Sequence, residues 1–313
     1  MAITDNMRMT LKVCRLYYED NLSQKEISAQ LGISRPQISR MLTNARNNNF
    51  VSIKINNPFS DETDLEQLLI ERYHLKDALV LNTINANEEG GKMEEFGRMA
   101  ASCIDGYIMD NSRIGVMSGQ TLSSMVRSIK HFGRRGLEFV SLVGGISSTS
   151  VKWHANVIAQ QLAECSGGSC YILNAPVIVQ SKQSRDMLVS EPGIASVLQK
   201  GLKCDVAIVG IGQINMNSTT FQAGALNTED IERLKASGAI ASVCTSYLDV
   251  SGKIIHTELE ERSIGLTLEQ LKKCRTIALA IGENKVESIK AALSSGYIDV
   301  FITNLDTARL IAK

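Results

Sequence analysis

The segment Ser23–Leu42, with the sequence SQKEISAQLGISRPQISRML, predicts two short helices joined by a sharp turn. Ser23 is a favourable N-cap, and Glu26 three residues later completes a capping box at the start of the first helix. Gly32 follows the apolar positions of that helix, and glycine suits the tight turn between two paired helices. The segment therefore contains the N-terminus of the first helix and the turn that separates it from the second.

The second helix of the pair is expected to start in the same way. Ser34 is placed as its N-cap with Gln37 as the capping-box partner, and Pro36 is tolerated in the first turn. Two capping boxes with a glycine between them are typical of a helix-turn-helix, whose second helix enters the major groove of DNA. We therefore predict that this segment binds double-stranded DNA.

The predicted recognition helix separates apolar from polar side chains. Its apolar positions fall on one side, and its arginine and glutamine side chains can bond bidentately to guanine and adenine. The residues that we expect to contact DNA are Ser34, Arg35, Gln37, Ser39, Arg40, Asn44 and Arg46. Arg35, Gln37 and Arg40 are expected nearest to the bases, and the others nearer to the phosphates and sugars.

The flanking sequence completes an N-terminal domain over residues 1–55. A first helix is expected over about residues 7–20, and the alternating segment FVSIKI is expected to form the strand of a wing. The first 60 residues carry eight basic and four acidic side chains, whereas the whole chain has 33 of each. A basic N-terminal domain followed by an acidic remainder of the chain favours binding of that domain to a polyanion.

Residues 56–76 are expected to form a linker and a connecting helix. The segment NNPFSDET is rich in turn-forming residues, and Thr63 with Glu66 makes a further capping box before an amphipathic stretch. The sequence leaves open whether this helix packs on the following domain or on a second subunit.

The cysteines and the apolar segments indicate the cellular compartment in which the protein is expected. The seven cysteines are dispersed without a CxxC pair, which favours reduced thiols in an intracellular protein and offers no metal site. No apolar run approaches the roughly 18 residues of a membrane span. The N-terminus has no apolar segment of the signal-peptide kind. We expect a cytoplasmic protein with no membrane partner, no cofactor and no metal.

From residue 77 to residue 313 the chain alternates between short apolar segments and helical ones. The expected strands are DALVLNT, RIGVMS, LEFVSLVG, CDVAIVGIG, RTIALAIG and DVFITN. The expected helices cover about residues 91–109, 121–131, 154–165, 228–236, 284–294 and 305–312. This alternation predicts an α/β domain with a Rossmann-like, mostly parallel sheet covered by helices on both faces. Such sheets bind ligands beyond the carboxyl ends of their strands.

One loop after a predicted strand has the composition of an anion site. Ser118, Gly119, Gln120 and Thr121 leave a strand and open a helix. The glycine allows the backbone to approach a ligand, and the free N–H groups and positive end of the helix favour a phosphate. We expect these residues to hold the anionic part of a small molecule.

Two further loops follow strands in the same way. Gly144 and Gly145 precede a cluster of hydroxyl side chains. Gly282 ends another strand, and Lys285 in the first turn of the next helix can hold a phosphate as a point charge. Each loop alone is ordinary turn chemistry, but together they predict a small-molecule site at one edge of the sheet.

With these residues in view, the chain resembles the SorC family of sugar-binding transcriptional regulators along nearly its whole length. The segments that carry the resemblance are LYYEDNLSQKEISAQLGISRPQISRML, IGVMSGQTL, LVGG, DVAIVGIG, YLDVSGKII, AIGENK and ITNLDTARLI. The resemblance implies a helix-turn-helix head, a sugar- or sugar-phosphate-sensing body, and an oligomer, often a tetramer, that regulates carbohydrate genes. It adds Gly212 and Asp249 to the expected site.

The body also resembles the glucosamine-6-phosphate deaminases and ribose-5-phosphate isomerases, whose phosphate loop is similar to SGQT. The deaminases place an aspartate and a histidine for proton transfer where this chain has Gln213, Ile214 and Asn215. None of these three side chains takes up a proton near neutral pH, which favours binding without turnover. The alternative function is a sugar-phosphate isomerase or deaminase-like enzyme with an accessory DNA-binding head.

Two departures from the SorC family concern the effector. Many members have a tryptophan where this chain has Ser118, and often the sequence TDE where this chain has residues 303–306. The sequence therefore leaves two effector classes as alternatives, a sugar phosphate and an unphosphorylated sugar or polyol. Trp153, the single tryptophan, is placed either to stack on a sugar or to pack in the core.

These observations predict a regulator of carbohydrate-metabolism genes that binds operator DNA as a homo-oligomer, a dimer or a tetramer. A sugar, polyol or sugar phosphate would shift the population of body arrangements and so alter the DNA-binding heads. The expected effector-binding residues are Ser118, Gly119, Gln120, Thr121, Gly144, Gly145, Gly212, Asp249, Gly282 and Lys285.

Overall fold

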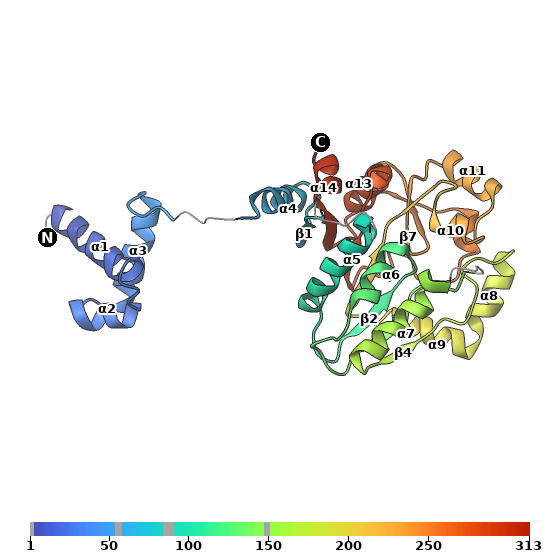
Figure 1. Ribbon diagram of the computed structural model, residues 1–313, viewed down its shortest axis with the longest axis horizontal. Coiled ribbons are helices and arrows are strands. Elements are labelled where there is room, and N and C mark those ends of the chain that lie inside the picture. Colours follow the sequence, from blue (N-terminus) through green and yellow to red (C-terminus); the bar gives the residue numbers. More distant parts are fainter. Residues whose placement is uncertain (1–2, 54–57, 84–90, 147–150) are drawn as a thin grey trace. The chain divides into compact units, whose positions relative to one another are not determined.

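Two units make up the chain in the computed structural model, Met1–Pro58 and Phe59–Lys313 (Figure 1). The structure describes residues 3–53, 58–83, 91–146 and 151–313. The first unit contains only helices, and the second contains every strand of the described ranges. The described parts of the chain are therefore a helical head and an α/β body.

The head is the predicted helix-turn-helix, formed by α1 (Ile3–Tyr18), α2 (Gln24–Leu31) and α3 (Arg35–Asn47). Gly32 ends α2 in the left-handed conformation with φ of +67°, which allows the sharp turn into α3. The apolar sides of the three helices meet in one small core. Its buried members are Val13, Cys14, Ile27, Ile38, Leu42 and Ala45.

Only one of the two predicted capping boxes is present in the head. The backbone N–H of Ser23 donates to the Glu26 carboxylate at 2.8 Å, and the Ser23 hydroxyl accepts from the Glu26 N–H at 3.3 Å. Ser34 occupies the N-cap position of α3, but its side chain makes no capping hydrogen bond. The predicted second box is therefore wrong, because the Gln37 N–H donates to the Ser34 carbonyl instead, at 2.9 Å.

The predicted wing is not found where the structure describes the chain. Residues 51–53 form no strand, and the last two residues of FVSIKI lie outside the described residues. The first helix starts at Ile3, earlier than the expected residue 7, and ends at Tyr18.

The connecting helix α4 (Ser60–Tyr73) packs within the body. Leu69 is buried in the body's core, and the Arg72 guanidinium donates to the carbonyls of Ile311 and Ala312 at 3.2 and 3.0 Å. The predicted capping box of Thr63 is wrong, since Thr63 lies inside the helix and its hydroxyl donates to the Phe59 carbonyl at 3.0 Å. The helix therefore packs on the following domain.

A seven-stranded parallel sheet forms the centre of the body, in the order β1-β11-β10-β5-β2-β3-β4. All six predicted strands are present, and the edge strand β4 was not predicted. Their bounds are β1 (Asp77–Leu81), β2 (Arg113–Val116), β3 (Glu138–Ser141), β4 (Ser169–Tyr171), β5 (Val206–Gly210), β10 (Arg275–Leu279) and β11 (Val300–Asn304).

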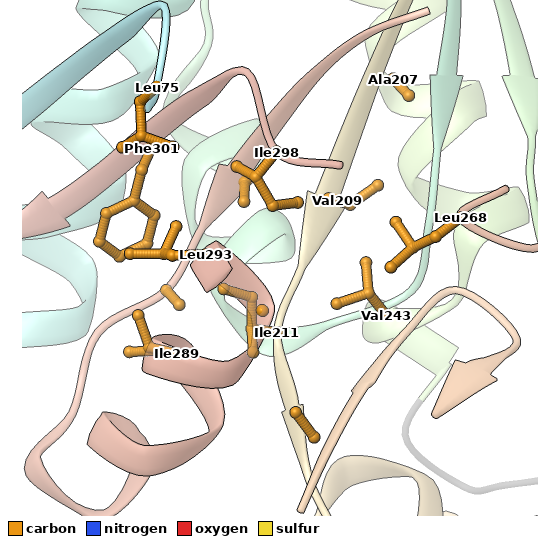
Figure 2. Close-up of a cluster of buried hydrophobic side chains, with 14 of the residues drawn as sticks. Leu75, Ala207, Val209, Ile211, Val243, Leu268, Ile289, Leu293, Ile298 and Phe301 are labelled. Atoms are coloured by element: carbon orange, nitrogen blue, oxygen red, sulfur yellow. The ribbon is translucent and has the colours of Figure 1, made fainter. Parts of the chain in front are cut away.

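Helices cover both faces of this sheet, as the apolar strands predict. Along β5, Val206 and Ile208 pack on one face and Ala207 and Val209 on the other, because side chains alternate along a strand. One face is covered by α5 (Gly91–Cys103), α6 (Gln120–Ser128) and α7 (Ala155–Ser166). The other face is covered by α4, α13 (Val286–Ser294) and α14 (Leu305–Ala312), and Figure 2 shows part of its packing around Phe301 and Val209.

A second sheet was not predicted. It is antiparallel, in the order β6-β7-β8-β9, and it is inserted into the chain between β5 and β10. Its strands have two or three residues each, which is too short for a periodic pattern. They are β6 (Gly212–Gln213), β7 (Ala241–Val243), β8 (Ser246–Leu248) and β9 (Ile254–Ile255).

Shorter helical elements fill the remaining connections of the body. The helices α8 and α9 were not predicted, whereas α11 was. The elements are η1 (Ile104–Tyr107), η2 (Val151–Trp153), α8 (Lys182–Ser190), α9 (Pro192–Gly201), α10 (Thr219–Gln222), α11 (Thr228–Ala236), α12 (Glu258–Glu261) and η3 (Glu283–Lys285). Among helices in the described ranges, none combines the length and the apolar character needed to cross a bilayer. The same ranges hold no group of three or more histidine, cysteine, aspartate or glutamate side chains placed for a metal ion.

Candidate functional site

The order of the parallel strands places a ligand crevice between β2 and β5. From β2 the chain proceeds to β3 and β4 toward one edge, and β5 then returns to pair with the other side of β2. In open α/β sheets a ligand binds beyond the carboxyl ends of the strands at such a reversal. A cavity of about 440 Å³ lies at this position, lined by Met117 after β2 and by Ile211 after β5.

The first wall of the cavity is the start of α6. Residues Ser118 to Leu122 line it, and the N-cap Gly119 makes no side-chain capping bond. The Gly119 N–H donates to the Trp153 carbonyl at 2.9 Å, and the first hydrogen bond of the helix runs from the Ser123 N–H to the Gly119 carbonyl at 3.0 Å. The N–H groups of Gln120, Thr121 and Leu122 therefore have no partner within the helix. They are donors suited to an anion.

Trp153 contributes to this wall through its backbone rather than its ring. Its carbonyl oxygen holds the Gly119 N–H, whereas its side chain is not part of the cavity lining. The ring is half-buried outside the cavity, so the structure does not place it against a sugar.

Lys285 supplies a positive charge to the cavity. It ends η3, which follows Gly282, and the Gly282 N–H is held by the Thr307 hydroxyl at 2.9 Å. Burial lowers the pKa of the Lys285 ammonium, and no described carboxylate forms an ion pair with it. The other lysine of the lining, Lys92, is ion-paired with Asp306. Lys285 is thus a partly buried cation without a counter-charge in the part of the chain described.

The opposite wall comes from the antiparallel sheet and the loops beside it. Ile214, Leu226 and Tyr247 give it apolar surface. Amides and hydroxyls are interspersed with these side chains, as in pockets for small polar molecules. They are Gln213, Asn217, Ser218, Thr219, Thr220, Ser242, Thr245 and Ser263. Among the described residues the lining contains no aspartate, glutamate or histidine.

Most of this second wall escaped the sequence prediction. Its residues lie on strands of two or three residues, on the short helix α10 and on turns, so no run of sequence marks them as a group. Gly212 is the exception, because it belongs to the segment GIG that follows β5. A Cβ atom at Gly212 would stand 2.5 Å from the Ser242 hydroxyl, so a larger residue there would require the Ser242 side chain to move.

The predicted DNA-binding surface is a separate feature of the head. All seven residues that we expected to contact DNA are exposed, while Ile38, Leu42 and Ala45 on the other side of α3 are buried. The Arg40 Nε donates to the Pro36 carbonyl at 3.3 Å, one turn earlier in the helix. The helix therefore presents a basic and polar side to solvent, as a recognition helix requires.

Known proteins are similar to this chain in sequence and in fold. Residues 57–313 match the family model described as "Putative sugar-binding domain". This chain belongs to that family. It is 29% identical over 310 residues to the deoxyribonucleoside regulator of Bacillus subtilis (strain 168), covering 99% of this chain and 98% of that protein.

The match to SorC proteins extends over the whole chain. The sorbitol operon regulator of Klebsiella pneumoniae is 27% identical over 316 residues, with 100% of both proteins covered. The crystal structure of full-length SorC from K. pneumoniae aligns with a TM-score of 0.75 at 26% identity, covering 99% of this chain and 100% of that one. The resemblance to the SorC family is thereby confirmed. Because these relatives are named as regulators, the chain is a transcriptional regulator with a sugar-binding domain and not an enzyme.

Seven of the ten residues expected at the effector site of this SorC-family regulator line the cavity. They are Ser118, Gly119, Gln120, Thr121, Gly212, Gly282 and Lys285. Gly144 and Gly145 lie outside the lining. A Cβ atom at Gly144 would stand 2.6 Å from the Ala175 carbonyl oxygen, and the Gly145 N–H donates to that same carbonyl at 2.7 Å. Gly144 therefore allows two backbone segments to pass closely.

Asp249 also lies outside the cavity and organises a turn instead. Its carboxylate accepts hydrogen bonds from the Ser251 hydroxyl at 2.7 Å, the Ser251 N–H at 2.9 Å and the Lys253 N–H at 3.0 Å. These donors, the Ser251 hydroxyl foremost, hold the pKa of Asp249 below its usual range. Gly252, with φ of +83°, completes the turn between β8 and β9.

Replacing Asp249 with alanine is expected to lower the free energy of unfolding by about 1 to 2 kcal/mol, since three turn donors lose their acceptor. Effector affinity should stay unchanged. The pKa of Asp249 is lowered on folding, so its contribution is present above the ordinary aspartate pKa and is lost as the pH falls through the folded value. Denaturant unfolding at neutral and acidic pH measures this difference. If the variant instead lost effector binding and kept its stability, Asp249 would have to be an effector-binding residue.

Proposed function

We propose that the cavity binds a phosphorylated sugar of monosaccharide size and that its occupancy changes operator binding by the head. Lys285 is the observation that carries this proposal, because it is a partly buried cation lining the cavity with no described counter-charge. Keeping an unpaired charge away from water is costly. A phosphate bound beside Lys285 would provide the missing negative charge.

The rest of the lining supports the same orientation of the ligand. The uncapped N–H groups at the start of α6 and the hydroxyls of Ser118 and Thr121 are donors for phosphate oxygens. The amides and hydroxyls of the second wall suit the hydroxyl groups of a sugar. An unphosphorylated sugar or polyol could use the second wall alone, but it would leave Lys285 without its partner.

The names of the relatives support a carbohydrate effector and an operator as partners. They are named for deoxyribonucleosides, for the sorbitol operon and, in Brucella abortus, for erythritol catabolism. We propose that Arg35, Gln37 and Arg40 contact bases of operator DNA in the cytoplasm. Helix-turn-helix proteins read paired half-sites, so we also propose a homo-oligomer, a dimer or a tetramer.

A thermal-shift screen tests the effector class. We expect glucose-6-phosphate, fructose-6-phosphate, ribose-5-phosphate or sorbitol-6-phosphate to raise the melting temperature, while the matching unphosphorylated compounds have little effect. A ligand at about 100 times its dissociation constant stabilises the folded state by about 2.7 kcal/mol. Chromatography of the recovered ligand should show no conversion. Equal stabilisation by phosphorylated and unphosphorylated compounds would contradict the phosphate site.

A further inference from the structure

Gln213 has an unusual environment in the wall of the cavity. It lies on β6, it is only 7% exposed, and it lines the cavity. Its Nε2 atom is shielded from solvent and has no hydrogen-bond partner among the described residues. Buried side-chain donors are nearly always paired, so an unpaired one inside a binding cavity points to a partner that arrives with the ligand.

A chain of hydrogen bonds fixes which end of this amide is unpaired. The backbone N–H of Asn217 can only donate, and it donates to the Asn215 Oδ1 at 2.9 Å. The Asn215 Nδ2 is therefore the atom that faces Gln213, and it donates to the Gln213 Oε1 at 2.6 Å. The oxygen of Gln213 is thus occupied, and its Nε2 is the unpaired end.

We infer that Gln213 is a specificity-determining residue whose amide N–H groups donate to an oxygen of the sugar. This inference rests on the proposed sugar-phosphate site. The partner must be an acceptor, such as a hydroxyl, ring or carbonyl oxygen. A protonated amine has no acceptor to offer, and Gln213 has no free oxygen to accept from one. The site therefore selects neutral hydroxylated sugars over amino sugars at this position.

Asn215 is the positioning residue in this arrangement. It does not line the cavity, but it holds the Gln213 oxygen away from the ligand. Without Asn215, the amide of Gln213 is free to turn over and present its oxygen. Replacement of Asn215 should then relax the preference between a sugar and the matching amino sugar.

The test uses the full chain and isothermal titration calorimetry with glucose-6-phosphate, glucosamine-6-phosphate, fructose-6-phosphate, ribose-5-phosphate, sorbitol-6-phosphate and inorganic phosphate. The Gln213→Met variant keeps the size of the side chain but removes both donors. We expect roughly 10- to 100-fold weaker binding of the tightest neutral sugar phosphate. Inorganic phosphate, which engages only the Lys285 end, should bind as in the unmodified protein and thereby show that the variant is folded.

Two further variants sharpen the result. Gln222→Met serves as the matched control, since Gln222 is exposed at the end of α10 and does not line the cavity. It should bind every probe normally. In the Asn215→Ala variant, the affinity ratio of glucose-6-phosphate to glucosamine-6-phosphate should move toward one, which a purely structural role for Asn215 would not produce.

The outcomes separate this inference from the function on which it rests. If the unmodified protein binds sugar phosphates and Lys285→Met weakens them, but Gln213→Met does not, the role of Gln213 is overturned and the phosphate site stands. If no sugar phosphate binds the unmodified protein, the proposed function fails and the inference falls with it. A Gln213→Met protein that melts well below the Asn215→Ala protein when empty would also overturn the inference, because both variants lose the Asn215–Gln213 hydrogen bond and the further loss would show that Nε2 has a partner already.

Discussion

Replacing Lys285 with methionine is expected to weaken binding of a sugar phosphate by about 100-fold, the upper part of the range for removal of one charged hydrogen-bond partner. The empty protein should at the same time become more stable. Methionine keeps the apolar stem of the side chain and removes a charge that is partly buried without a described counter-charge. Calorimetry with the phosphorylated ligand and thermal unfolding of the empty protein measure the two opposite effects.

The pH dependence of these effects follows from the lowered pKa of Lys285. Because the folded pKa lies below the unfolded one, the folded protein bears the cost of the charge at neutral pH. That cost is relieved as the pH rises through the folded pKa. The stability advantage of the Lys285→Met variant should therefore shrink at alkaline pH. Effector affinity of the unmodified protein should fall over the same range, since the neutral amine no longer attracts phosphate.

Lys290 provides the matched control on the following helix. It is ion-paired with Glu287 and does not line the cavity, so Lys290→Met should leave effector affinity unchanged. An arginine at position 285 keeps the charge and should retain more affinity than methionine. Undiminished affinity in the Lys285→Met variant would remove Lys285 from the site and, with it, the main support for a phosphorylated effector.

Replacing Arg40 with alanine is expected to weaken operator binding by about 10- to 100-fold, because a good bidentate bond to a base contributes about 1 to 3 kcal/mol of discrimination. Arg40 is exposed on α3, and its Nε makes only a local bond to the Pro36 carbonyl. Because Arg40 is exposed, the substitution should leave the packing of the head's apolar core unchanged. Fluorescence anisotropy with operator DNA, compared with a scrambled duplex at the same salt concentration, measures the effect.

The comparison of the two duplexes decides which part of the DNA Arg40 binds. If its guanidinium bonds to a base, the Arg40→Ala variant should bind the operator much more weakly while its affinity for the scrambled duplex changes little. If the guanidinium bonds to a phosphate, both affinities should fall alike. Arg98 is a surface arginine of the body that pairs with Glu95, so Arg98→Ala is the control and should not affect DNA binding. Effector affinity should be normal in the Arg40→Ala variant. An equal decrease of operator affinity and effector affinity would contradict the assignment of DNA binding to the head.

Local sequence features predicted the parts of this protein that local forces form. The capping box of Ser23, the left-handed Gly32 and the buried Ile38 follow from chain geometry within a few residues. The six long strands were recognisable because a strand buried on both faces is a continuous apolar run. The loop from Ser118 to Thr121 was recognisable for a similar reason, since its donors belong to one helix start.

The same local reasoning failed where other hydrogen-bond partners were available. Ser34 resembles an N-cap with a capping box, yet the Gln37 N–H is satisfied by a backbone carbonyl. Gly144 was expected at the site from its loop, and Asp249 from the resemblance to the SorC family, but neither lines the cavity. Gly144 lies against the backbone of Ala175, and the Asp249 carboxylate accepts hydrogen bonds within its own turn. A loop glycine or aspartate has the same sequence signature in either role.

By itself, the sequence determined a helix-turn-helix head, a parallel α/β body and the start of α6 with its N–H donors, because each depends on neighbours along the chain. Only the tertiary structure decided which strands lie next to each other, and thus that the loops after β2, β5 and β10 share one cavity with Lys285. It also brought β6 and β7 to the opposite wall and left the Nε2 atom of Gln213 unpaired there among the described residues. These facts depend on packing between distant segments, which the spacing of residues along one chain does not encode.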